Sequence, residues 1–83
     1  MSIADLSDFR EIGREFGRNI AVAVSQAIDQ GFRDPALHRD YVFGVLLPAK
    51  ADELRIMGAS QLQTAAYVRC ARREVIKLMS RAA

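Results

Sequence analysis

The chain has 83 residues, of which 51% are hydrophobic and 27% are charged, and its formal net charge is +2. A chain of this length forms one domain, residues 1–83, and this composition is too apolar for a disordered segment. Its single cysteine, Cys70, excludes an intramolecular disulfide framework and a cysteine-based zinc site, so we expect neither a metal nor a cofactor.

The sequence does not predict secretion or membrane insertion. Asp5 and Asp8 lie where a signal peptide would be basic. The longest apolar run, residues 41–49, is far shorter than the roughly 20 residues that cross a bilayer. We therefore expect a cytoplasmic protein that does not bind membranes. Ten arginines against two lysines are typical of a GC-rich bacterial or phage genome.

The first predicted helix spans about residues 4–30 and ends before Gly31, because glycine suits the position that follows a helix. Apolar residues recur along it at alternating spacings of four and three, as in a heptad seam. The seam consists of Phe9, Gly13, Phe16, Ile20, Ala23 and Ala27.

Gly13 and Gly17 are unusual inside a long helix, because each costs about 1 kcal/mol relative to alanine. We expect another backbone to come close there; the alternative is a tolerated kink, or two helices broken near Gly17. The apolar surface is also more than one small chain can easily hide, which predicts a homodimer. Its expected interface comprises Phe9, Gly13, Phe16, Gly17 and Ile20.

The second predicted helix spans about residues 35–47. Asp34 is a good N-cap, and Pro35 suits the first helical position because its missing N–H is not needed there. Residues 41–47 are apolar on every side, which predicts burial all round, in a core or between subunits. A buried strand is the alternative for this run, although the helical neighbours argue against it. Pro48 should end the helix or start a new turn.

A short linker helix of about residues 49–57 should end at Gly58. Ser60 and Gln63 then form a capping-box pattern at the head of the last predicted helix, residues 60–81.

The last predicted helix has two opposite faces. Arg69, Arg73, Lys77 and Arg81 recur every four residues, with Arg72 beside them, while Val68, Ala71, Val75, Leu78 and Ala82 follow the other side. Five basic residues against one acid give residues 60–83 a charge of +4. Four arginines against six acids give residues 1–34 a charge of −2.

This cationic face could simply be solvated, or it could meet the acidic first helix in the same molecule or a dimer mate. Like charges four residues apart cost a few tenths of a kcal/mol per pair, so three consecutive pairs favour an acidic or phosphate-bearing partner. On the first helix, acids alternate with Arg10, Arg14 and Arg18, which is typical of a mixed salt-bridged surface.

Residues 49–77 also resemble the general layout of a helix-turn-helix, with Gly58 in the turn. Glutamine and arginine near the front of such a recognition helix can read base edges, and further arginines can hold phosphates. The pattern is a poor one, because Leu54 is bulky where a small residue is needed and Thr64 replaces a large apolar residue.

We do not expect catalysis. His38 is the only histidine, and the adjacent carboxylates Asp52 and Glu53 lie on a short exposed helix. The sequence therefore predicts an all-α bundle of three main helices and a linker helix. Its expected function is that of a regulatory or adaptor protein, for example a phage- or plasmid-encoded inhibitor, that binds an acidic surface of another protein. The alternative is a dimeric DNA-binding regulator. The expected binding residues are Gln61, Gln63, Arg69, Arg72, Arg73, Lys77 and Arg81.

Overall fold

Helices account for almost all of the computed structural model, which describes the backbone of residues 6–81 and the side chains of residues 6–80. The elements are α1 (Leu6–Asp29), α2 (Pro35–Tyr41), the π-helical segment η1 (Val42–Leu46), α3 (Leu47–Ile56) and α4 (Gln61–Arg81). No strand occurs among these residues, so the all-α prediction is confirmed. The expected start of the first helix, at about residue 4, lies outside the described range.

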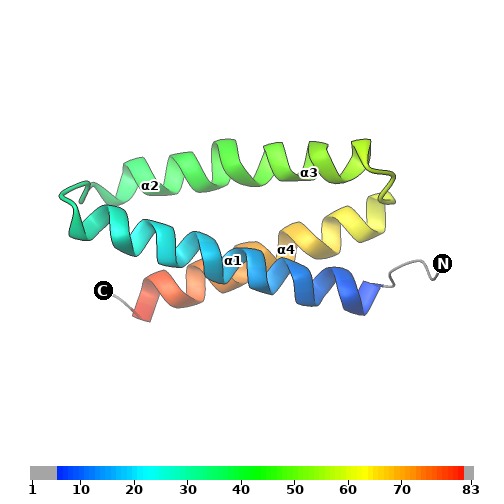
Figure 1. Cartoon of the computed structure of the whole chain (residues 1–83), viewed down its shortest axis with the longest axis horizontal. Coiled ribbons are helices and arrows are strands. Elements are labelled where there is room, and N and C mark those ends of the chain that lie inside the picture. Colours follow the sequence, from blue (N-terminus) through cyan, green and yellow to red (C-terminus); the bar gives the residue numbers. More distant parts are fainter. Residues whose placement is uncertain (1–5, 82–83) are drawn as a thin grey trace.

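Three rods make up the bundle, because α2, η1 and α3 follow one another without a break. Figure 1 shows this combined rod along one side of the molecule, with α1 and α4 crossing each other on the other side. The crossing of α1 and α4 positions the candidate site described below.

Short-range hydrogen bonds fix the helix ends that the sequence predicts. Asp34 accepts from the Ala36 N–H at 3.0 Å, and Ser60 and Gln63 make both bonds of the capping box, at 2.8 and 3.1 Å. Gly31 and Gly58 have φ values of 109° and 100°, a left-handed conformation that glycine adopts without a Cβ clash. The predicted N-cap at Asp34, the capping box of Ser60 and Gln63, and the predicted helix ends at Gly31 and Gly58 are therefore confirmed.

Of the two predictions for Pro48, the helix end is wrong, whereas the start of a new turn agrees with its place in the first turn of α3. Leu47 keeps helical angles, φ −67° and ψ −43°, and donates its N–H to the carbonyl of Val42, five residues back. In an unbroken α-helix the proline ring would press against the carbonyl of Gly44, four residues back. The wider π turn makes room for the ring. The expected separate linker helix is therefore the second half of one long rod.

The core lies where the three rods meet. It contains the buried residues Ile20, Val24, Val42, Leu47, Ala71 and Val75, with half-buried Phe16, Phe43, Leu46, Val68 and Met79 packed against it. The last helix buries its predicted seam, with Leu78 half-buried, and Ala82 lies outside the described residues.

On α1 the predicted seam is wrong at Ala23 only, since Ala27 is half-buried like Phe9 and Phe16. Val24 is buried, whereas Ala23 is exposed. At about 100° per residue, the buried residues Gly13, Gly17, Ile20 and Val24 lie within about 60° of one another around α1, whereas Ala23 lies about 60° outside this face.

The close approach expected at the α1 glycines is confirmed, and the approaching backbone is that of α4. A Cβ on Gly17 would lie 2.5 Å from the Ala71 carbonyl oxygen, and one on Gly13 would overlap the Tyr67 carbonyl. α1 also continues as one helix through both glycines. Only glycine allows these two helices to cross at this distance.

The apolar segment 41–47 is buried on one side only, so the prediction of burial all round is wrong within one chain. Val42 is 1% exposed, while Tyr41 and Val45 on the outer side are 54% and 53% exposed. A three-rod bundle offers each rod one inner face, and the outer face of this rod has no further helix to cover it.

Candidate binding groove

A groove runs along the side of the α1–α4 crossing. We call it the arginine groove; its volume is about 390 Å³. It is lined from α1 by Leu6, Arg10 and Arg14 and from α4 by Leu62, Ala65, Ala66, Arg69, Cys70 and Arg73.

The positions of the four arginines follow from helix geometry. Arg10 and Arg14 are one turn apart on α1, and Arg69 and Arg73 are one turn apart on α4. Because Gly13 and Gly17 let the two backbones come close, both pairs border a single groove. Between them, Leu62 and two alanines contribute apolar surface, and Leu62 is 71% exposed.

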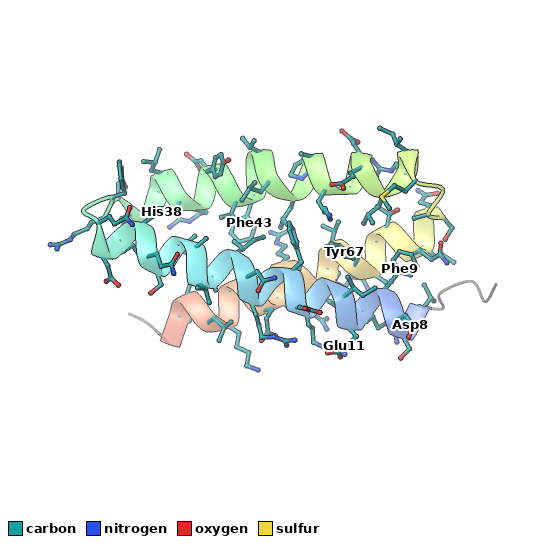
Figure 2. All side chains as sticks on the ribbon, viewed as in Figure 1. Asp8, Phe9, Glu11, His38, Phe43 and Tyr67 are labelled. Carbon is teal, nitrogen blue, oxygen red and sulfur yellow. The ribbon has the colours of Figure 1, made fainter. Side chains whose placement is uncertain are left out.

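Acidic neighbours neutralise part of this charge. Glu11 pairs with Arg14 at 2.5 Å and lies 3.8 Å from Arg18. The hydrogen bond and charge of Arg14 lower the pKa of Glu11, and the same hydrogen bond raises the pKa of Arg14, with Cys70 and Glu74 of α4 adding to the effect. Figure 2 shows Glu11 on the side of α1 away from the α2–α3 rod. The mixed salt-bridged surface predicted for the first helix is therefore present.

The other three arginines of the groove, Arg10, Arg69 and Arg73, form no ion pair within residues 6–80. The groove therefore presents a net positive charge beside the apolar side chains that line it.

Of the seven binding residues predicted from the sequence, the structure brings only Arg69 and Arg73 into the arginine groove. Lys77 is exposed one turn further along α4, and Gln61 is exposed in its first turn. The Gln63 side chain accepts a hydrogen bond from the Ser60 N–H within the capping box. The side chain of Arg81 lies outside the described residues.

Arg72 faces another part of the molecule. Its guanidinium lies 5.5 Å from the ring centroid of Phe43, which Figure 2 shows between the α2–α3 rod and α1. Arg72 is therefore directed toward Phe43 and does not line the arginine groove.

Sequence reasoning missed Arg10 and Arg14 as groove residues. Their alternation with acids favoured a solvated surface, and only the crossing point places them opposite Arg69 and Arg73. One feature of the sequence could have identified them. Gly13 indicates the face of α1 that another helix approaches, and Arg10 and Arg14 lie close to Gly13 in the sequence.

The five residues predicted for a dimer interface pack within the single chain. Gly13, Gly17 and Ile20 are buried, and Phe9 and Phe16 are half-buried. Gly13 and Gly17 face α4, so the contact with α4 accounts for their small size without a second copy. Dimerisation itself stays a prediction.

A second, apolar groove of about 340 Å³ lies between α1, α3 and α4. Its lining includes Phe9, Leu54, Met57 and Tyr67, and Figure 2 shows Phe9 and Tyr67 near the same end of the bundle. The ammonium group of Lys50 lies 6.0 Å from the Tyr67 ring centroid, so its charge faces an aromatic surface.

Burial raises the pKa of Tyr67 from 10.0 to about 12, with smaller contributions from Glu53 and Glu15. The fold thus favours the neutral phenol, whose stabilising effect is complete below pH 10 and is lost as the pH rises from 10 through about 12. We expect the urea midpoint of Tyr67→Phe to fall less steeply in this range than that of the wild type. Equal slopes for Tyr67→Phe and the wild type would contradict the prediction.

Other chemistry is sparse in the described residues. Cys70 is a free, half-buried thiol, and the His38 ring is hydrogen-bonded to the Phe32 carbonyl, which ties α2 to the loop that follows α1. No group of three or more histidine, cysteine or acidic residues in this part of the chain could hold a metal ion. Nor does any helix within it combine the length and apolar character that crossing a membrane requires.

Comparison with protein-family models, with curated proteins and with solved structures finds no match for this chain.

Proposed function

We propose that this protein is a non-catalytic adaptor of the cytoplasm that binds an acidic amphipathic helix of another protein in the arginine groove. One observation carries the proposal: four arginines from two helices border a groove that also contains the apolar side chains Leu6 and Leu62. Binding there would sequester, inhibit or tether the partner. The arginine-rich composition fits a bacterial or phage regulator of a host protein.

The two kinds of side chain in the groove suit an amphipathic ligand. Guanidinium groups make paired hydrogen bonds to carboxylates, and the three arginines without an ion pair in the described chain, Arg10, Arg69 and Arg73, can meet acids of a bound helix. Leu6 and Leu62 can contact apolar residues on the adjoining face of the same helix. This is the helix-in-groove mode of peptide recognition, in which apolar anchors give affinity and charges give orientation.

DNA is the alternative partner, and the exposed row Arg69, Arg73 and Lys77 favours it. Two features of α4 count against it. Gln63 is engaged in the capping box, so it is poorly placed to read bases. Leu62 would stay exposed beside a phosphate backbone, whereas an amphipathic helix would cover it.

Fluorescence polarisation with two labelled probes tests the proposal. The first probe is a helical peptide with glutamates four residues apart beside a leucine face, and its matched control carries glutamine at each glutamate position. The second probe is random-sequence duplex DNA. Each is titrated at about 50 mM and about 200 mM salt, because DNA binding through several phosphates weakens steeply with salt.

We expect the acidic peptide to bind more tightly than its glutamine control and to remain bound at the higher salt. Binding of DNA alone, lost at higher salt, would replace the adaptor by the DNA-binding alternative. Absence of binding to both peptide and DNA at low salt would contradict both.

A further inference from the structure

Arg14 differs from the other three arginines of the arginine groove, because an acid of its own helix already pairs with it. The Glu11 carboxylate, almost one turn earlier on α1, lies 2.5 Å from the Arg14 guanidinium and 3.8 Å from that of Arg18. These two contacts use different oxygens of the carboxylate. A carboxylate of a bound helix can therefore pair with Arg14 only by displacing Glu11 or by sharing the guanidinium with it.

The surroundings of Arg14 are acidic on the α4 side as well. The hydrogen bond and charge of Glu11 raise the pKa of Arg14, and Cys70 and Glu74 of α4 add smaller contributions. Glu74 and Arg14 are both half-buried, whereas the other three arginines of the groove are exposed. Among the side chains that the structure describes, Arg14 is therefore the groove arginine whose charge is already balanced in the free protein.

We propose that Glu11 competes with the acids of the bound helix for Arg14, and so sets how acidic a helix must be to bind. The inference rests on the function proposed above and concerns the selectivity of that same groove. In the free protein Glu11 pairs with Arg14. When an acidic helix binds, one of its carboxylates replaces Glu11, which keeps Arg18 as a partner.

The pair of Glu11 and Arg14 is suited to this exchange. Their side chains are 61% and 41% exposed, so a ligand can reach both. An exposed ion pair contributes little to stability, because water competes for both groups. The exchange replaces one carboxylate by another, so Arg14 adds little affinity while Glu11 is present.

Selectivity follows from the difference between Arg14 and the other three arginines. A helix whose acids reach only Arg14 gains little, because each new contact costs an existing one. Acids that reach Arg10, Arg69 and Arg73 displace no ion pair of the described chain. The groove should therefore reject weakly acidic helices, and Glu11 supplies the repulsion on which such discrimination depends.

Fluorescence polarisation of the acidic peptide probe with the full chain tests the role of Glu11. Glu11→Gln frees Arg14 and should tighten binding by about fivefold relative to Glu15→Gln. Glu15→Gln is the matched control, since it removes the same charge from an exposed position one turn further along α1. Glu15 forms no ion pair within residues 6–80. The glutamine control peptide should bind both variants equally, because it has no acid to offer to Arg14.

A double-mutant cycle identifies the arginine for which Glu11 competes. Arg14→Gln should weaken binding by less than about twofold when Glu11 is present, and by about fivefold when it is combined with Glu11→Gln. The second substitution would thus cancel the gain from the first. Circular dichroism confirms that each variant is folded before its affinity is compared.

The outcomes separate this inference from the function on which it rests. If the wild type binds the acidic peptide, equal affinities of Glu11→Gln and Glu15→Gln would overturn the competition by Glu11. Equal losses from Arg14→Gln with and without Glu11 would overturn it as well. Absence of peptide binding in the wild type and in every variant would overturn the proposed function, and the role of Glu11 with it.

Discussion

Replacement of Gly13 by alanine is expected to lower the free energy of unfolding by about 2–3 kcal/mol. The added Cβ would overlap the carbonyl of Tyr67, and backbone atoms of a packed helix cannot move aside as a flexible side chain can. α1 and α4 would have to separate, which loosens the contacts of Ile20, Ala71 and Val75. The loss is a large share of the roughly 4–12 kcal/mol expected for a domain of this length.

Gly44→Ala is the matched control, because it makes the same chemical change in open space. It should raise the free energy of unfolding by about 1 kcal/mol through helix propensity alone. Urea denaturation followed by circular dichroism, at one and the same protein concentration, compares the two variants. Equal stabilisation by both substitutions would show that α1 and α4 do not approach at Gly13.

The contrast between these glycines shows what the sequence could reveal about the fold. Two glycines in one long helix indicated the close approach of another backbone, because the loss of helix stability at each glycine is a local effect of known size. Which helix approached was not visible, since the same signal fits a second copy of α1 and the α4 of the same chain. The partner depends on contacts far apart in the sequence.

Helix ends were predictable because they depend on local contacts, whereas the effect of Pro48 depends on tertiary contacts. A cap involves a few neighbouring residues, as in the bonds between Ser60 and Gln63. The effect of Pro48 depends on whether the preceding turn can widen, and packing of Val42 and Leu47 against the core stabilises the widened turn. A local rule therefore predicted a helix end where tertiary contacts keep the rod continuous.

The candidate site was predicted in part. The regular spacing of Arg69 and Arg73 along one helix identified half of the arginine groove. Arg10 and Arg14 were hidden, because their partners across the groove are more than fifty residues away in the sequence. Arg72 was included only because it is next to Arg73, although the helical rotation sends it toward Phe43.

Replacement of both Arg69 and Arg73 by glutamate should weaken binding of the acidic peptide by about 100-fold. Hydrogen bonds to charged groups contribute about 1.5–3 kcal/mol each, and the new glutamates add repulsion. Loss of two such contacts corresponds to at least two powers of ten in the dissociation constant. The double variant should remain folded, since both side chains are exposed.

A comparison of Arg72→Glu with Arg73→Glu separates the groove from a general cationic helix. The two substitutions change the net charge equally and lie at adjacent positions on α4. If the groove binds the peptide, Arg73→Glu should weaken binding by about tenfold, the equivalent of one charged contact, and Arg72→Glu should change it little. If binding depends only on the overall charge of α4, the two variants should lose affinity equally. Equal losses would therefore contradict peptide binding in the arginine groove. They would also contradict the role proposed for Arg10 and Arg14.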